Sequence, residues 1–123
     1  MARILIIDDE AMIRDLLVNI LEREGYETIT ASGGKDGIKI YRENPADLII
    51  TDLLMPEKDG LETIMELRRE FQDVKIIAMS GGGKVDPDTY LQIAKTMGAI
   101  KTISKPFERK ELLKTIQEIL EQV

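Results

Sequence analysis

The chain has 123 residues, 43% of them hydrophobic, and a formal net charge of -6. A chain of this length can bury a core of its own, and its negative charge argues against a general affinity for nucleic acids or anionic membranes. It has no cysteine and no histidine. This excludes thiol chemistry, disulfides and imidazole catalysis, and leaves carboxylates, hydroxyls and lysines to carry any chemistry.

No apolar run approaches the roughly 20 residues that a membrane span requires. The N-terminal residues lead directly into a predicted strand rather than into a signal peptide. We therefore expect a soluble, cytoplasmic protein that folds as one domain over residues 1–123, with no membrane contact.

The first half of the chain alternates predicted strands with predicted helices. β-Branched and apolar runs predict strands at 3–7, 27–31 and 48–52. A helix between Glu10 and Gly25 is indicated by helical spacing of its apolar residues, and Gly25 is expected to end it. A second helix is predicted at 35–43 and a third from Asp59, its expected N-cap. The expected core residues of these helices are Ile13, Leu16, Leu17, Ile20 and Leu21, then Ile38 and Tyr41, then Leu61, Ile64, Met65 and Leu67.

The second half repeats the same alternation. Strands are predicted at 75–79 and 99–103, and three consecutive glycines follow Ser80. A helix is expected to begin at Asp86-Pro87 and to end at Gly98. A final helix at 108–122 should bury Leu112, Leu113, Ile116, Ile119 and Leu120. Such alternation predicts an α/β fold with a parallel sheet, covered by helices on both faces and joined by right-handed crossovers.

Polar residues gather at the carboxyl ends of the predicted strands. Asp8 and Asp9 follow the first strand, Asp52 ends the third, Ser80 follows the fourth and Lys105 follows the fifth. In an open α/β sheet these positions border one crevice, so the side chains can converge. Clustered carboxylates suit a hard cation such as Mg²⁺, and an ammonium and a hydroxyl can hold phosphoryl oxygens.

Each of these residues also has a purely structural interpretation. Asp8 and Asp9 can cap the first helix, Ser80 can serve as an ordinary turn residue, and Lys105 can be a solvated loop lysine. We favour a functional site because unrelated turn residues have no reason to supply acids, a hydroxyl and an ammonium along one edge.

The chain resembles the receiver domains of bacterial two-component response regulators over essentially its whole length. The resemblance rests on Ile6-Ile7-Asp8-Asp9-Glu10, Asp52-Leu53-Leu54-Met55-Pro56 with Asp59-Gly60, Met79-Ser80-Gly81 and Lys105-Pro106-Phe107. It implies a flavodoxin-like (βα)5 three-layer sandwich with a five-stranded parallel sheet of order 2-1-3-4-5.

The resemblance also implies a role for each site residue. Asp52 is then the phosphoacceptor, and Mg²⁺ is held by Asp8, Asp9, Asp52 and the backbone carbonyl of Leu54. Ser80 is the hydroxyl switch, Lys105 is the site lysine, and the Lys105–Pro106 peptide bond is cis. Many members of the family carry an aromatic residue where this chain has Thr102. We expect Thr102 either to move with Ser80 or, preferably, to pack as a strand residue.

Two functions are compatible with these residues. The first is a signalling module, not an enzyme, that takes a phosphoryl group from a phosphohistidine of a sensor kinase or a histidine phosphotransfer protein. Its output passes to a downstream protein target without direct nucleic-acid contact. The alternative is a metal-dependent phosphohydrolase of the haloacid dehalogenase type. Those enzymes place a second acid two residues after the nucleophile, where this chain has Leu54, so we rank this alternative far lower.

Overall fold

The computed structural model describes residues 2–53, 60–80, 92, 94–96 and 98–121. Its strands are β1 (Arg3–Ile7), β2 (Glu27–Ala31), β3 (Leu48–Asp52), β4 (Ile76–Ser80) and β5 (Lys101–Ser104). Its labelled helices are α1 (Ala11–Arg23), α2 (Gly34–Glu43), α3 (Gly60–Glu70) and α5 (Arg109–Glu121). Residues 92 and 94–96 are also helical. The expected helix starts at Asp59 and at Asp86-Pro87 lie outside the described residues.

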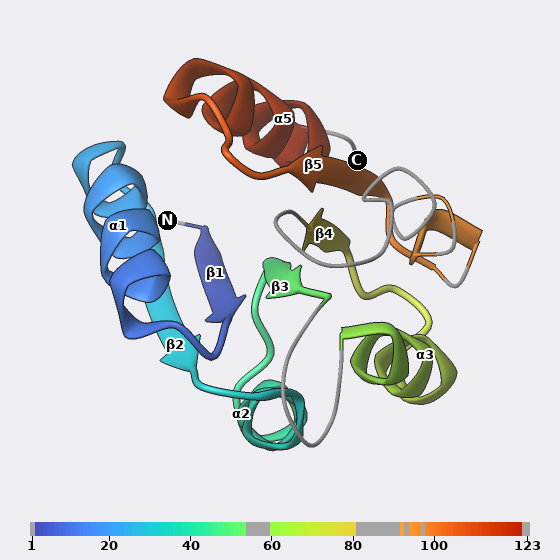
Figure 1. The fold of residues 1–123 in the computed structure, drawn as a ribbon. Coiled ribbons are helices and arrows are strands. Elements are labelled where there is room, and N and C mark those ends of the chain that lie inside the picture. Colours follow the sequence, from blue (N-terminus) through green and yellow to red (C-terminus); the bar gives the residue numbers. More distant parts are fainter. Residues whose placement is uncertain (1, 54–59, 81–91, 93, 97, 122–123) are drawn as a thin grey trace.

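The strands form one parallel sheet in the order β2-β1-β3-β4-β5. Helices α1 and α5 cover one face, and α2 and α3 cover the other (Figure 1). Alternate strand residues face the two layers, so that Ile49 belongs to the α2–α3 side and Ile50 to the α1–α5 side. The three-layer, flavodoxin-like arrangement predicted from the sequence is confirmed.

The central strands are buried on both faces. Every residue of β3 and of β4 is buried, and most of β1 is buried too. This explains why their sequences are continuous apolar runs rather than alternating patterns. The polar residues of β3 and β4 are Thr51, Asp52 and Ser80, and they lie at or next to the carboxyl ends of these two strands.

Helix ends follow the expected chemistry in part. Gly25 has a φ of 88° and follows the C-cap residue of α1, as predicted for a left-handed terminating position. Gly98, with a φ of 132°, ends the helical residues that precede it. At the start of α1 the N-cap position is Glu10, which makes no side-chain capping bond.

Two residues predicted to face the core are exposed instead. Leu16 on α1 is 46% exposed and Met65 on α3 is 48% exposed. The buried stripe of α3 begins at Gly60 and continues through Thr63, Ile64 and Leu67. This spacing of i, i+3, i+4 and i+7 leaves Met65 beyond the contact with the sheet. On α1, Leu16 borders an open hollow shared with Phe107 and Arg109 rather than the sheet.

The last two strands begin later than predicted. β4 starts at Ile76 rather than Lys75, and β5 starts at Lys101 rather than Ala99. The parallel register pairs Ser80 with Ser104 as the last residues of both strands. Ser80 is consequently part of the sheet, which fixes its backbone more firmly than a loop position would.

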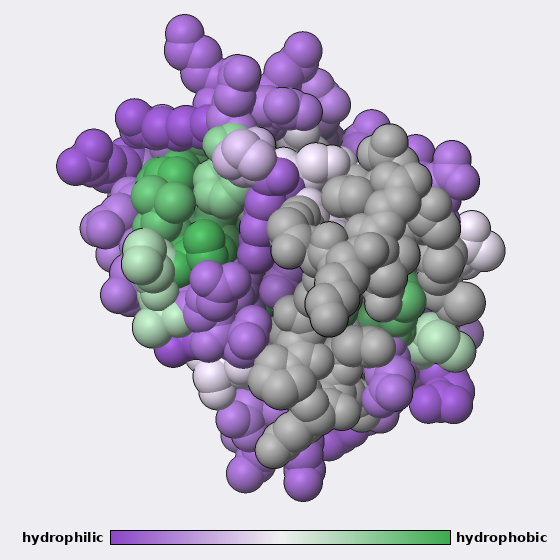
Figure 2. All heavy atoms as spheres, in the orientation of Figure 1, coloured by the Kyte–Doolittle hydropathy of each residue, from purple (hydrophilic) through white to green (hydrophobic). Residues whose placement is uncertain are grey.

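The described part of the face in Figure 2 is mainly hydrophilic, with an apolar area over α1. Met12, which is 80% exposed, and Leu16 are the large exposed apolar residues of this helix. Within the described ranges, no helix is long and apolar enough to cross a membrane.

Candidate functional site

Three carboxylates meet at the carboxyl edge of the sheet. Asp8 directly follows β1 and Asp52 ends β3, and these adjacent strands pair Ile7 with Thr51. One carboxylate oxygen from each of Asp8, Asp9 and Asp52 lies within 4.8 Å of the other two. Asp8 and Asp52 are buried whereas Asp9 is exposed. The cluster is thus embedded in the fold on one side and open to solvent on the other.

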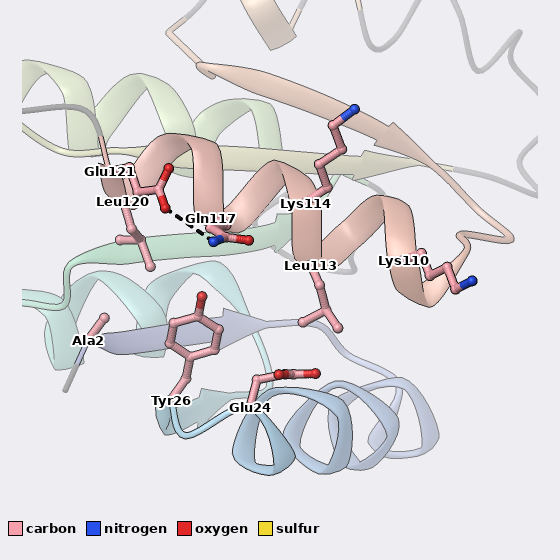
Figure 3. A pocket seen from close by; sticks show the side chains of 9 residues that line it. All are labelled: Ala2, Glu24, Tyr26, Lys110, Leu113, Lys114, Gln117, Leu120 and Glu121. Atoms are coloured by element: carbon pink, nitrogen blue, oxygen red, sulfur yellow. Dashed lines mark hydrogen bonds between the residues drawn. The ribbon is translucent and has the colours of Figure 1, made fainter.

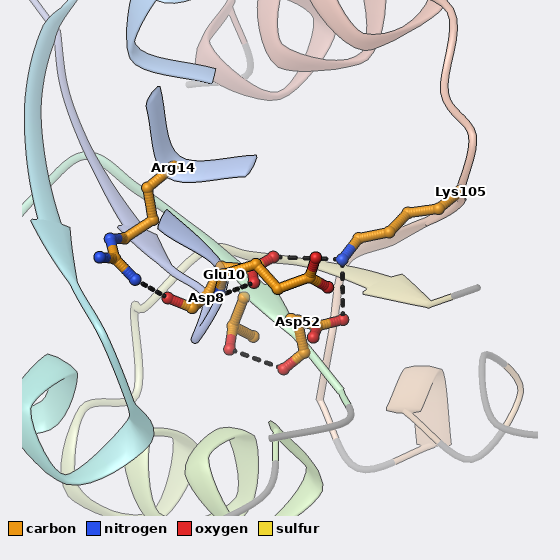
Figure 4. A network of polar contacts seen from close by, with 6 residues as sticks. Asp8, Glu10, Arg14, Asp52 and Lys105 are labelled. Atoms are coloured by element: carbon orange, nitrogen blue, oxygen red, sulfur yellow. Dashed lines mark hydrogen bonds and ion pairs between the residues drawn. The ribbon is translucent and has the colours of Figure 1, made fainter. Parts of the chain in front are cut away.

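Lys105 joins this cluster from the turn after β5. Its Nζ atom lies 3.1 Å from Asp8 Oδ2 and 3.3 Å from Asp52 Oδ1. Figure 4 shows the lysine side chain reaching across to both carboxylates. The Lys105–Pro106 peptide bond is cis, as the resemblance to receiver domains implies. A residue far along the chain thereby supplies the ammonium that bridges two of the acids.

The cluster of three acids and Lys105 has more acidic groups than basic ones. Burial raises the pKa of the Asp52 carboxyl to about 6, with Asp8 and Asp9 adding to the increase, although Lys105 opposes it. Burial lowers the pKa of Lys105, but Asp52 and Asp8 outweigh that effect, so its pKa is raised and it stays charged. One ammonium does not balance three acids, and a cation would relieve the remaining repulsion.

The polar atoms of Asp8 are held by several partners. Its N–H donates to the carbonyl of Ala31, and its Oδ1 accepts the N–H of Glu10 at 2.9 Å. Its own carbonyl accepts a hydrogen bond from the guanidinium of Arg14 at 2.7 Å (Figure 4). Sequence reasoning missed Arg14. Its position in the first helical turn, where side chains lean back toward the helix N-terminus, was the available signal.

The backbone around Asp52 is packed against the start of α3. A Cβ atom at Gly60 would lie 2.2 Å from the Asp52 carbonyl oxygen and 2.6 Å from the Cα of Leu53. The Gly60 N–H donates to the Leu53 carbonyl at 2.9 Å. Only glycine permits this approach, so Gly60 fixes the backbone that carries Asp52.

Ser80 and Lys105 are linked through their main chains. Ser80 is 2% exposed, and its carbonyl accepts the N–H of Lys105 at 2.7 Å. Thr102 pairs with Ala78 and borders a hollow that is also lined by Gln92 and Lys95. The structure therefore places Thr102 in strand packing beside that hollow. The Leu54 carbonyl and the glycine loop after Ser80 lie outside the described residues.

The donor set fits a hard divalent cation. Carboxylate oxygens are the ligands that Mg²⁺ prefers, and Mg²⁺ usually keeps several waters while binding one or two carboxylates. Two of the acids are held in place by the sheet, and the exposed Asp9 leaves room for water on the open side. No other group of three acids in the described part of the chain has this geometry.

A separate hollow of about 650 Å³ lies at the opposite end of the sheet, between α5 and the end of α1 (Figure 3). It is bordered by Tyr26 and Leu113 and by side chains of both charges, including Glu24 and Lys114. It shares no residue with the acid cluster. The hollow therefore does not compete with the carboxyl edge as the site of the chemistry.

Buried acids on adjacent strands, a bridging lysine after β5 and the 2-1-3-4-5 sheet together define a receiver domain, the phosphorylation-controlled input module of two-component signalling. Residues 4–117 match the family model described as the response regulator receiver domain. The chain belongs to this family.

Individual relatives agree with the assignment. The chain is 42% identical over 119 residues to a probable transcriptional regulator, ycf27, of Porphyra purpurea, covering 96% of this chain and 47% of that protein. It is 30% identical over 118 residues to sporulation initiation phosphotransferase F of Bacillus subtilis, covering 96% and 93%. The chain spans about half the length of the first curated relatives it matches.

Solved structures give the same result. A response regulator receiver domain protein from Clostridium thermocellum superposes with a TM-score of 0.91 at 30% identity, covering 99% of this chain and 96% of that one. Chemotaxis protein CheY4 of Vibrio cholerae gives a TM-score of 0.85 at 31% identity, covering 97% and 98%. None of these similarities supports the haloacid dehalogenase alternative.

Proposed function

We propose that Asp52 accepts a phosphoryl group from a phosphohistidine of a partner protein, a sensor kinase or a histidine phosphotransfer protein. A carboxylate oxygen of Asp52 forms a bond to phosphorus while the phosphorus–nitrogen bond breaks. The imidazole nitrogen keeps the electron pair of that bond and takes a proton. The observation that carries this proposal is the bridging of Asp8 and Asp52 by Lys105 beside the exposed Asp9.

Asp8, Asp9 and Asp52 would hold Mg²⁺, together with the Leu54 carbonyl that the family resemblance implies. Bound there, the ion would neutralise charge on the phosphoryl oxygens. Each residue of the cluster would have a separate role. Asp8 and Asp9 would orient the ion and Asp52 would supply the nucleophile, while the burial of Asp52 limits the access of competing water.

Lys105 and Ser80 would respond to the new phosphoryl group. The Lys105 ammonium, already beside Asp52, can pair with a phosphoryl oxygen, and the Ser80 hydroxyl can donate to another. Because the Ser80 carbonyl also accepts the Lys105 N–H, movement of one residue is transmitted to the other. The acyl phosphate thereby biases a two-state equilibrium at this end of β4 and β5.

Residues 1–123 would form one receiver domain that acts through protein partners. The module is an acceptor that assists its own phosphorylation rather than an enzyme with a separate substrate. A net charge of -6 disfavours direct binding to nucleic-acid phosphates, so we expect a downstream protein target.

The test is incubation with acetyl phosphate and Mg²⁺, followed by intact-mass measurement and mapping of the modified residue. We expect one phosphoryl group, on Asp52, only when Mg²⁺ is present. The Asp52→Asn variant should gain none, and Asp9→Ala should gain little. Asp15→Asn removes an exposed acid from α1 and serves as the matched control, which should behave as the unmodified protein. Phosphate on another acid, or modification without Mg²⁺, would overturn the proposal.

A further inference from the structure

Arg14 lies beside the acid cluster without contacting its carboxylates. It belongs to the first turn of α1, where its backbone N–H donates to the Glu10 carbonyl at 3.1 Å. Its side chain turns back toward the helix N-terminus and donates to the carbonyl of Asp8 at 2.7 Å (Figure 4). The residue is partly buried, so this bond is sheltered from water.

Four contacts together fix Asp8. Its N–H is held by β2 through Ala31, its Oδ1 by the Glu10 N–H, its Oδ2 by Lys105 and its carbonyl by Arg14. The first contact comes from the neighbouring strand, and two of the others depend on the turn that joins β1 to α1. The turn has no capping side chain at Glu10, so the Arg14 side chain adds a tie to α1 beyond the main-chain bonds that the Glu10 carbonyl accepts.

The two cationic side chains near Asp8, Lys105 and Arg14, bind different atoms of it. Lys105 binds carboxylate oxygens that a metal ion would also use, whereas Arg14 binds a main-chain carbonyl. Arg14 can therefore remain in place when the carboxylates receive a cation. Partners behind metal ligands commonly orient them, and their loss typically weakens metal binding about 10–100-fold.

We propose that Arg14 is a positioning residue that holds the β1–α1 turn so that the Asp8 carboxylate faces the cation site. This inference rests on the proposed function, since it assigns Arg14 a part in Mg²⁺ binding. Arg14 contacts neither the ion nor the phosphoryl group. It acts through the main chain of Asp8.

The direction of the change in Mg²⁺ affinity distinguishes a positioning role of Arg14 from a purely electrostatic one. Arg14 carries a positive charge near the cluster, and removing that charge alone would reduce repulsion and tighten Mg²⁺ binding. Loss of a positioning contact would weaken it. Arg14→Met, which removes charge and donor but keeps much of the apolar stem, should therefore weaken Mg²⁺ binding about tenfold.

The experiment combines two measurements on the full chain. Mg²⁺ affinity is obtained by titration, and amide hydrogen exchange of Glu10, whose N–H donates to Asp8 Oδ1, is followed without metal. In Arg14→Met the Glu10 amide should exchange about tenfold faster. Arg14→Lys, which retains a charged donor, should recover part of both effects. Arg23→Met removes an exposed cation from the same helix and should change neither.

The outcomes are distinguishable. Weaker Mg²⁺ binding and faster Glu10 exchange in Arg14→Met, with recovery in Arg14→Lys, support the inference. Unchanged or tighter Mg²⁺ binding in Arg14→Met overturns it while leaving the proposed function intact. A lower free energy of unfolding with unchanged Mg²⁺ affinity also overturns it, since Arg14 would then be structural only. Failure of the unmodified protein to bind Mg²⁺ overturns the proposed function as well.

Discussion

The Lys105 ammonium lies 3.3 Å from the carboxylate of Asp52, and both side chains are largely withdrawn from solvent. The lysine acts as a counterion for an acid whose charge would otherwise be poorly tolerated. Because it also reaches Asp8, it stabilises the arrangement of two buried carboxylates before any cation arrives.

Asp52→Asn should stabilise the metal-free protein at pH 7. Burial raises the pKa of Asp52 from 3.8 to about 6, so the folded state holds its proton more tightly than the unfolded state. The free energy of unfolding therefore falls as the pH rises from about 3.8 to about 6, by up to about 3 kcal/mol. Asparagine does not titrate, so the Asp52→Asn variant should not show this decrease in the free energy of unfolding. Urea unfolding in chelator should show the largest gain at pH 7 and almost none below pH ~4. An equal gain at all pH values would contradict the prediction.

Lys105→Met should tighten Mg²⁺ binding several-fold while it blunts the response to phosphorylation. The ammonium repels an incoming cation and occupies carboxylate oxygens, so its removal favours the ion. Lys101→Met removes an exposed lysine from β5, the strand that precedes the Lys105 turn, and is the matched control. Isothermal titration with Mg²⁺ measures both variants. Weaker binding in Lys105→Met would show that the lysine organises the acids more than it competes for them.

Gly60→Ala should destabilise the fold by about 1–3 kcal/mol, the usual cost of overpacking. The added Cβ would meet the main chain of Asp52 and Leu53, which cannot move aside as a flexible side chain can. Phosphorylation by acetyl phosphate should slow as Asp52 is displaced. Gly33→Ala is the control, since Gly33 has an extended φ of -167° and open space at its Cβ. Equal denaturation midpoints for the two variants would contradict the packing argument.

Ser80→Ala should leave Mg²⁺ affinity unchanged, because Ser80 is not one of the clustered acids. It should reduce the structural response to a phosphoryl mimic such as beryllofluoride. The Lys105 amide, which donates to the Ser80 carbonyl, is a direct reporter of that response. Its hydrogen exchange should change on adding beryllofluoride in the unmodified protein and change less in Ser80→Ala. The same change in both proteins would remove Ser80 from the switch.

Two neighbouring leucines on α1 should differ sharply in their effect on stability. Leu17 is 1% exposed and packs against the sheet, so Leu17→Ala should cost about 2–5 kcal/mol. Leu16 is 46% exposed, and Leu16→Ala should cost less than about 0.5 kcal/mol. Chemical denaturation measures both. Comparable losses would mean that Leu16 is buried in solution.

The sequence predicts the fold well because strand and helix patterns alternate without ambiguity. The apolar runs that end at Ile7 and Asp52 identify buried strands, and a parallel sheet places their carboxyl ends along one edge. That these two strands are neighbours is implied by the resemblance to receiver domains. The convergence of Asp8, Asp9, Asp52 and Lys105 could therefore be predicted from order along the chain. The motifs typical of receiver domains give the same residues independently.

Other features depend on contacts that linear spacing does not specify. Helical periodicity places Leu16 and Met65 near the apolar face, but only the packing of the layers decides which edge of that face is covered. The position of Arg14 in the first helical turn allows a contact with the preceding turn, but the acceptor is a main-chain carbonyl, which residue type and spacing do not identify. The exact ends of β4 and β5 depend on register, which is set by pairing between strands rather than by either strand alone.

The sheet order divides the site into two parts. The acids come from β1 and β3, whereas the hydroxyl and the lysine belong to β4 and to the turn after β5, with the boundary between β3 and β4. A chimera joined in the segment between these strands would take its ion-binding acids from one parent and its responding groups from the other. Because Lys105 contacts Asp8 and Asp52, the ion affinity of such a chimera would depend on both parents, whereas the hydroxyl of Ser80 would come from one parent alone.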